Sequence, residues 1–217
     1  MKLFNLLIPG DLHIVSRGFR KSDSSAAIFL DLDGTLWPDL GPGTIFANQH
    51  IDNDLLIEID KLSKSGYAII GFTNQTYFGY QSRLSLMQSL RYRYHIKLLV
   101  KKGVLDAIFI CHHHPDSKID TLRGECDKRK PASGLLLWAR DKLSISLESS
   151  YAVGDRITDL VAAFQCGINK TFLLVGPDCM KWNKSGVSIK KRIITFQVSK
   201  DLKETLGKIS GEISAGR

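Results

Sequence analysis

The 217-residue sequence predicts an α/β fold, a doubly wound and mainly parallel sheet with helices on both of its faces. Two observations lead to this prediction. Short, wholly apolar segments, typical of strands that are buried on both sides, alternate along the chain with segments whose apolar residues recur at helical spacing. Acidic and polar residues follow several of these strands, at the edge where parallel α/β sheets bind their ligands.

The composition is that of an ordinary globular protein, with 43% hydrophobic and 24% charged residues. No apolar run approaches the ~18 residues of a membrane span, and the first residues do not form a good signal peptide. The four cysteines are too widely spaced for a disulfide framework, so we expect a cytoplasmic location and no membrane partner. The net charge of +8 favours anionic partners, either a phosphorylated small molecule or nucleic acid.

Residues 1–25 are predicted to be an N-terminal arm and residues 26–217 a single domain. The arm begins with an apolar stretch at residues 3–8, which we expect to form an edge strand or to pack against the domain. Its end, at residues 21–25, is polar and is typical of a connector. No chemistry is assigned to the arm.

The first strand of the domain is predicted at Ala26–Leu30, where five apolar residues follow one another. Asp31 and Asp33 come directly after it and, being two residues apart, leave an extended chain on the same face. Two carboxylates so placed attract a cation, and one of them can attack phosphorus while the other transfers a proton. Gly34 allows a sharp turn. An acidic turn with no chemistry is the alternative.

The next elements are predicted to be a loop at residues 37–50, a helix from Asp52 to Gly66 and a strand at Tyr67–Thr73. The hydroxyl of Thr73 and two amides after it can donate hydrogen bonds to an oxyanion, although a polar loop is the alternative. A second helix is predicted from Ser82 into the nineties. One side of this helix carries Leu84, Met87, Leu90, Tyr94 and Leu98.

A strand at Ala107–Cys111 is followed by a long irregular segment at His112–Lys130, and a loop of this length is usually functional. Closely spaced cysteine and histidine residues in it indicate zinc, and the alternative is a polar loop with incidental histidines. The cysteine and histidine residues in and next to this loop are Cys111, His112, His113, His114 and Cys126.

The remaining elements continue the alternation. They are a helix capped by Ser133, a strand at Tyr151–Asp155, a helix that stops at Gly167, a strand at Thr171–Val175, a late edge strand at Ile193–Phe196 and a closing helix at Asp201–Ile209. Asp155 ends one of these strands, and Asp159 lies one turn into the helix that follows. Together with Asp31 and Asp33 these acids fit Mg²⁺, with Thr73 and Lys130 beside a phosphate.

These residues resemble the motifs of the haloacid dehalogenase (HAD) superfamily of phosphatases. The four motifs are matched by Asp31-Leu32-Asp33-Gly34-Thr35, Thr73, Lys130 and Gly154-Asp155-Arg156-Ile157-Thr158-Asp159. The chain is most similar to histidinol-phosphate and heptose bisphosphate phosphatases, a branch with a minimal cap. The segments that carry this closer likeness are Phe72-Thr73-Asn74-Gln75, Cys111-His112-His113-His114-Pro115 and Arg129-Lys130-Pro131.

The resemblance covers residues 26–176 and implies a HAD-like, Rossmannoid phosphatase domain. It implies that Asp31 is a nucleophile that becomes an aspartyl-phosphate, and that Asp33 protonates the leaving oxygen and then activates water. Mg²⁺ would be held by Asp31, the backbone carbonyl of Asp33, and Asp155. The remaining implied roles are phosphoryl binding by Thr73 and Lys130, support of the metal site through hydrogen bonds by Asp159, and substrate contact by Asn74 and Arg129.

The resemblance also implies a zinc loop, with one departure. Members of the branch carry Cys-x-His and then Cys-x-Cys, which Cys111, His113 and Cys126 match, but Lys128 stands at the fourth position. A charged lysine is a poor ligand, so a zinc ion here would need water, or His112 or His114, to complete its shell.

The implied function is a Mg²⁺-dependent phosphomonoester hydrolase, with D-glycero-D-manno-heptose 1,7-bisphosphate as the favoured substrate. Histidinol phosphate and a nucleic-acid 3′-phosphate are the alternative substrates, and a non-catalytic binding module is the alternative to an enzyme. We expect a monomer or a small homo-oligomer.

Overall fold

The computed structural model describes residues 11–16, 26–39, 51–76, 83–176, 186–189 and 192–216. Some features discussed above lie outside these residues. They are the apolar stretch at residues 3–8, the connector at residues 21–25, loop residues 40–50, and Cys179, one of the four cysteines. Among the described residues, no helix is long and apolar enough to cross a membrane.

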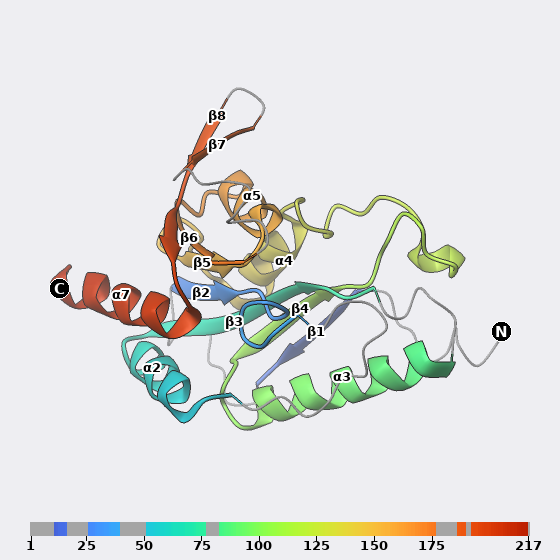
Figure 1. Cartoon of the computed structure of the whole chain (residues 1–217), viewed down its shortest axis with the longest axis horizontal. Helices are drawn as coiled ribbons and strands as arrows, with labels where there is room; N and C mark the ends of the chain where they lie inside the picture. Colours follow the sequence, from blue (N-terminus) through green and yellow to red (C-terminus); the bar gives the residue numbers. More distant parts are fainter. Residues whose placement is uncertain are drawn as a thin grey trace.

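The main sheet has seven strands in the order β1-β4-β3-β2-β5-β6-β9 (Figure 1). All neighbouring strands run parallel except β1, which pairs antiparallel with β4. This arrangement confirms the predicted fold class. The strands are β1 (Leu12–Val15), β2 (Ala26–Leu30), β3 (Tyr67–Asn74), β4 (Ala107–Cys111), β5 (Tyr151–Gly154), β6 (Lys170–Leu174) and β9 (Gln197–Ser199).

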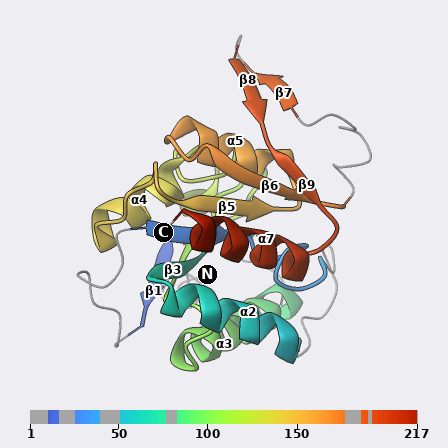
Figure 2. The same ribbon diagram turned by 90° about the vertical axis from the view of Figure 1, so that its left-hand side faces the viewer.

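Helices cover both faces of the sheet, with α2, α3 and α7 on one side and α4 and α5 on the other (Figure 2). Strand β2 shows why: Ile28 and Leu30 pack into the core beneath the first group, and Ala27 and Phe29 into the core beneath the second. Successive side chains of a strand point to opposite faces, so an uninterrupted apolar run requires cover on both. The helices are α2 (Asn53–Lys64), α3 (Arg83–Lys101), α4 (Gly134–Leu143), α5 (Ile157–Gln165) and α7 (Leu202–Ala215), with a short 3₁₀ helix η2 (Asp120–Leu122) in the long loop.

Helix α3 does not bury the side that the apolar pattern singled out. Met87, Leu90 and Tyr94 are 54%, 44% and 65% exposed, whereas Tyr92 and Ile96 are buried. The buried side of the helix also carries polar residues, so its sequence is not more apolar than that of the exposed side. The prediction from apolar spacing therefore selected the wrong side of the helix. The side chain of Leu84 lies outside the description.

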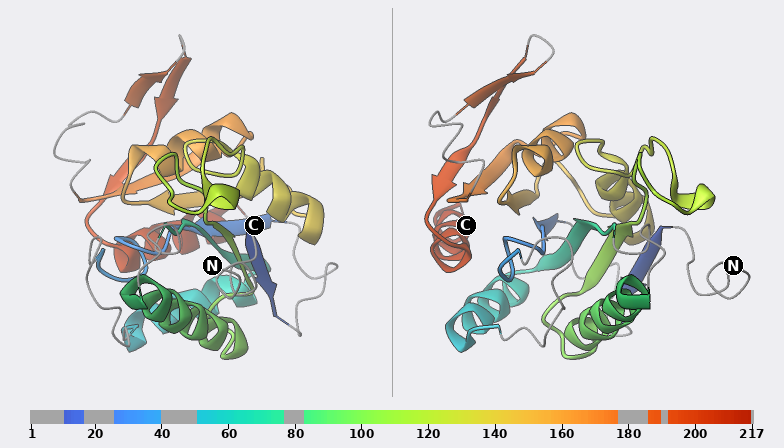
Figure 3. Two further views of the ribbon diagram at one scale, coloured as in Figure 1. Left: turned by 90° about the vertical axis from the view of Figure 1, so that its right-hand side faces the viewer. Right: turned by 45° about the vertical axis from the view of Figure 1, so that its right-hand side comes forward.

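The predicted late edge strand at Ile193–Phe196 is also misplaced. Strand β8 (Arg192–Thr195) pairs only with β7 (Gly186–Ile189) among the described strands, and this hairpin projects from the main sheet (Figure 3). The edge of the main sheet is β9, a few residues further on, which pairs with β6. A short apolar run predicts a strand but does not say which sheet it joins.

Strand β1 lies within the predicted arm, yet it belongs to the sheet of the domain. It pairs with β4 from Leu12 opposite Ile110 to Val15 opposite Ala107. Because the pairing is antiparallel, the start of β1 lies beside the carboxyl end of β4, where Cys111 is found. The chain just before β1 is therefore brought to the same edge of the sheet as the predicted site.

Candidate active site

The first acid, Asp31, is buried where β2 ends, and its backbone N–H donates to the carbonyl of Val153 at 3.0 Å. The turn that follows depends on Gly34, whose φ is +89°. A Cβ at this position would lie 2.2 Å from Oδ2 of Asp155, a contact that no side chain can make. The glycine therefore allows the turn after β2 to pack directly against the acid at the end of β5.

Lys130 forms the centre of the site. Its Nζ lies 2.5 Å from Oδ1 of Asp31 and 2.7 Å from Oδ1 of Asp159, and it also donates to the carbonyl of Phe72 at 3.2 Å. All three charged side chains are buried. Burial alone would lower the pKa of the lysine, but the carboxylates of Asp159 and Asp31 outweigh it and raise that pKa. Lys130 therefore remains a cation in this buried setting.

The acids outnumber the cation. Asp31, Asp155 and Asp159 each offer an oxygen within 4.8 Å of the others. Burial, and then the charge of Asp159, raise the pKa of Asp155 to about 6. Oδ1 of Asp155 is buried and accepts no hydrogen bond from the described part of the chain. A buried carboxylate oxygen without a donor, beside two further acids, fits a hard divalent cation such as Mg²⁺.

Asp33 has a different environment from Asp31. Trp37 donates to its Oδ1 through Nε1 at 2.7 Å, and Gln75 donates to its Oδ2 through Nε2. Burial raises the pKa of Asp33, and these two donors oppose that rise. Gln75 also donates to the hydroxyl of the buried Thr73 at 3.1 Å, so one amide links two predicted catalytic residues.

The sequence reasoning did not assign these roles to Trp37 and Gln75. The signal for Gln75 was available, because it lies two residues after Thr73 and so shares its side of an extended chain. The indole of Trp37 gave no such signal, since its approach to Asp33 depends on the turn at Gly34.

Asn74 and Arg129 hold the long loop in place. The side-chain amide of Asn74 donates to the backbone carbonyl of Lys130 and its oxygen accepts from the backbone N–H of Lys130, both at 3.1 Å. Arg129 donates through Nη1 to the carbonyl of His113 at 2.7 Å. These contacts fix the backbone from which the Lys130 side chain extends. Contact of either residue with substrate remains a prediction.

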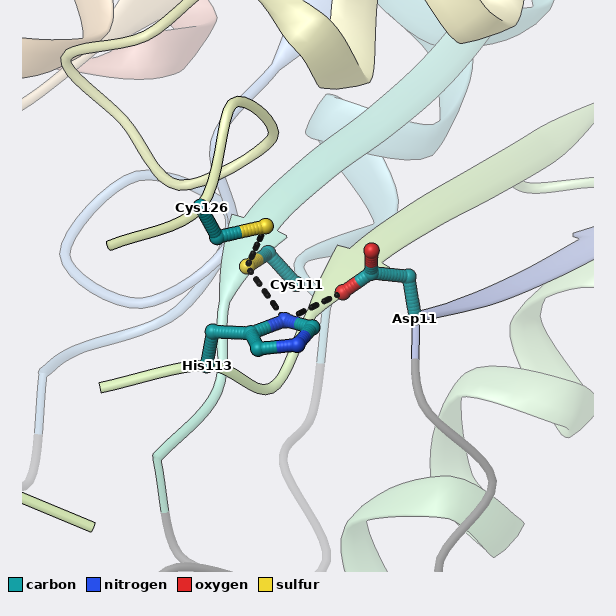
Figure 4. A group of neighbouring side chains, drawn as sticks. All are labelled: Asp11, Cys111, His113 and Cys126. Carbon is teal, nitrogen blue, oxygen red and sulfur yellow. Dashed lines mark hydrogen bonds and ion pairs between the residues drawn. The ribbon is translucent and has the colours of Figure 1, made fainter. Parts of the chain in front are cut away.

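The predicted cysteine and histidine ligands also converge, at the end of β4 (Figure 4). Sγ of Cys111 lies 3.9 Å from Sγ of Cys126 and 3.7 Å from Nδ1 of His113. A fourth residue joins them, since Oδ1 of Asp11 lies 3.0 Å from the same His113 nitrogen. The sequence reasoning missed Asp11, which lies in the predicted arm.

The other candidates for the fourth position have different partners. Nζ of Lys128 lies 3.2 Å from Oδ2 of Asp11. Nδ1 of His112 is 3.0 Å from the carbonyl oxygen of Gln75, and burial lowers the pKa of His112 to about 4. His114 accepts through Nδ1 from the backbone N–H of Asp116 at 3.1 Å. Neither histidine belongs to the group of converging ligand atoms.

Comparison with known proteins agrees with this geometry. Residues 128–193 match a family described as HAD-hydrolase-like. The D-glycero-beta-D-manno-heptose-1,7-bisphosphate 7-phosphatase of Yersinia pestis is 34% identical over 159 residues, which cover 70% of this chain and 82% of that protein. The chain belongs to the HAD superfamily, and like the named relatives it is a phosphatase, that is, a phosphoric monoester hydrolase.

Two further comparisons point to the same branch. The enzyme of the same name from Escherichia coli strain K12 is 34% identical over 152 residues, which cover 70% of this chain and 80% of that protein. The crystal structure of a D,D-heptose 1,7-bisphosphate phosphatase from B. bronchiseptica, complexed with magnesium and phosphate, superposes with a TM-score of 0.63 at 26% identity. That match covers 87% of this chain and 99% of the other.

Proposed function

We propose that this phosphatase removes a phosphoryl group from a sugar phosphate in a Mg²⁺-dependent reaction, with D-glycero-D-manno-heptose 1,7-bisphosphate as the substrate. The observation that carries the reaction type is the buried ammonium of Lys130, held between Asp31 and Asp159. Beside it lies an Asp155 oxygen that accepts no hydrogen bond from the described residues. The names of the relatives support the choice of sugar.

The metal site proposed here consists of Asp31, the backbone carbonyl of Asp33, and Asp155. The donors are all oxygen atoms, as Mg²⁺ requires, and substrate phosphate and water complete such shells. When bound, Mg²⁺ supplies positive charge to the phosphoryl oxygens. Asp159 acts through its ion pair with Lys130 and through the hydrogen bond that it accepts from the backbone N–H of Arg156 at 3.0 Å, which caps helix α5.

The covalent step is assigned to Asp31. One of its carboxylate oxygens attacks phosphorus, the bond from phosphorus to the sugar oxygen breaks, and Asp33 gives that oxygen its proton. Asp33 then accepts a proton from water as the water oxygen attacks the aspartyl-phosphate, which releases phosphate and restores Asp31. The raised pKa of Asp33 suits a carboxyl that must carry a proton for part of the cycle.

Charge on the phosphoryl group is balanced by the remaining residues. Lys130 supplies an ammonium and Thr73 a hydroxyl, both preorganised by the buried hydrogen bonds described above. Asn74 at the end of β3 and Arg129 in the long loop, which both support the loop backbone, are proposed to contact the substrate.

A nucleic-acid 3′-phosphate is the second candidate substrate, and the net charge of +8 favours it. The two proposals share their chemistry and differ in the leaving group, so a comparison of phosphate release from the two kinds of substrate separates them. DNA or RNA binding with a steep salt dependence would favour the second candidate.

The test is phosphate release by the purified full chain from the heptose bisphosphate, histidinol phosphate and a 3′-phosphorylated oligonucleotide, each with Mg²⁺ and with a chelator. We expect the highest kcat/KM for the heptose bisphosphate, and no phosphate release from any substrate in the presence of the chelator. The D31N variant should release no phosphate, whereas D60N, which changes an exposed acid on α2, should behave as the wild type. Equal turnover by D31N and wild type would overturn the proposed reaction, and a preference for the oligonucleotide would overturn the proposed substrate.

A further inference from the structure

We propose that Asp11, which directly precedes strand β1, is a metal ligand, and that it completes a zinc site with Cys111, His113 and Cys126. This site would join the N-terminal edge strand to the loop that carries Lys130. The proposal does not depend on the substrate or on the reaction proposed above, because it concerns a separate group of side chains at the end of β4.

The spacing of the four ligand atoms is the first argument (Figure 4). Sulfur, nitrogen and oxygen atoms bound tetrahedrally to zinc lie about 3.8 Å apart for two sulfurs, about 3.6 Å for sulfur and nitrogen, and about 3.4 Å for nitrogen and oxygen. The corresponding distances here are 3.9 Å between Cys111 and Cys126, 3.7 Å between Cys111 and His113, and 3.0 Å between His113 and Asp11. These three distances are within about 0.4 Å of the tetrahedral values, and all four ligand atoms lie within 4.8 Å of one another, so the side chains are close enough to share one zinc ion.

The topology of the sheet is the second argument. Leu12 pairs with Ile110, so the residue before Leu12 is brought next to the residue after Ile110, which is Cys111. Asp11 is distant from the other three ligands in sequence, and only the antiparallel pairing of β1 with β4 places it there. Its side chain is 10% exposed, so the carboxylate is held inside the group and does not extend into water.

The charge around the site is the third argument. Two thiolates and one carboxylate around Zn²⁺ carry a net charge of −1. Lys128 compensates it: its Nζ lies 3.2 Å from Oδ2 of Asp11 and 5.5 Å from the centre of the Trp138 ring. The lysine thus binds the outer oxygen of Asp11 while Oδ1 faces His113. Lys128 occupies the sequence position of the fourth ligand but cannot bind zinc, and instead it forms an ion pair with Asp11, the proposed fourth ligand.

The site has a consequence for the catalytic loop. The carbonyl of His113 accepts a hydrogen bond from Arg129, and the backbone of the next residue, Lys130, is held by Asn74. A metal bound to His113 and Cys126 would limit the movement of the part of the loop that leads to this segment. Metal binding by Asp11 would therefore help to position Lys130 without touching the substrate.

The experiment measures metal directly. The full chain, purified in a reducing buffer, is stripped with a chelator and reloaded with Zn²⁺ or with Co²⁺, whose visible spectrum reports tetrahedral and thiolate coordination. We expect one tightly bound Zn²⁺ per chain and a tetrahedral Co²⁺ spectrum with two thiolates. The D11N variant should bind Zn²⁺ at least about tenfold more weakly, and D11C should keep tight binding and show a third thiolate.

The control variant is D116N, which changes an acid on the same loop whose side chain is 91% exposed, and it should bind metal as the wild type does. Circular dichroism of every variant confirms that it is folded. Zinc affinity and a Co²⁺ spectrum unchanged in both D11N and D11C would overturn the proposal, as would failure of the wild type to bind Zn²⁺. A disulfide between Cys111 and Cys126 in protein prepared under reducing conditions would overturn it as well.

Discussion

Replacement of Lys130 by methionine tests how the acids at the centre of the site are held. The substitution keeps a long side chain but leaves Asp31 and Asp159, which lie 2.5 and 2.7 Å from the ammonium, without their cation. Removal of one partner from a buried ion pair typically costs about 3–5 kcal/mol, because the remaining charge is buried and uncompensated. For a chain whose stability falls by about 2 kcal/mol per molar urea, this lowers the unfolding midpoint by roughly 2 M.

The size of the effect should depend on pH and on metal. Unpaired carboxyls bind protons more tightly in the folded chain than in the unfolded chain, so the gap between K130M and wild type should narrow as the pH falls from 8 to 5. Mg²⁺ should raise the midpoint of K130M more than that of the wild type, since it relieves more repulsion there.

The assay is urea unfolding followed by tryptophan fluorescence and circular dichroism, at both pH values, with a chelator and with Mg²⁺. The matched control is K64M, which removes an exposed ion pair with Asp60 and should leave the midpoint nearly unchanged. Equal midpoints for K130M and wild type at pH 8 in the chelator would refute the reasoning, because the acids would then need no internal cation.

Three further predictions follow from the same geometry. D33N should lower kcat about 10²–10⁴-fold while the protein still binds phosphate, because Asn cannot transfer the proton; an unchanged kcat would exclude Asp33 as the acid and base. Q75A removes a donor to Asp33 and should lower kcat roughly tenfold or more, whereas a change confined to KM would show that Gln75 does not act through Asp33. Without Mg²⁺, the pKa of Asp155 in the folded chain is about 6, which is above its value in the unfolded chain. The melting temperature should therefore fall as the pH rises from about 4 to about 6. A rise over this interval would contradict the raised pKa of Asp155.

Much of the fold was predictable because the strands are short, apolar and separated by helices. The alternation in β2 of side chains between two cores explains why its sequence shows no polar face. Helix α3 was harder, since apolar residues occupy both its buried side and its exposed side, and only the packing against the sheet distinguishes Ile96 from Tyr94.

The acids of the site were predictable for a related reason. Asp31 and Asp155 directly follow strands, and parallel strands bring their carboxyl ends to one edge of the sheet. Lys130 comes from a long irregular loop, so no strand end located it. Its place beside a phosphate was predicted from its positive charge, and the family resemblance then gave it the role of phosphoryl binding. Asp11 had no local signal of any kind, because its neighbours are set by one antiparallel strand pair.

The most direct test of the proposed reaction is to trap the covalent step. The wild-type protein is mixed with the heptose bisphosphate and Mg²⁺, quenched within one turnover, and treated with borohydride, which reduces an aspartyl-phosphate to homoserine. Peptide mass spectrometry should find the modification at Asp31 and not at Asp33, and should find none when Mg²⁺ is chelated. Turnover with no modified Asp31, or with the modification on another side chain, would contradict the assignment of Asp31 as the nucleophile.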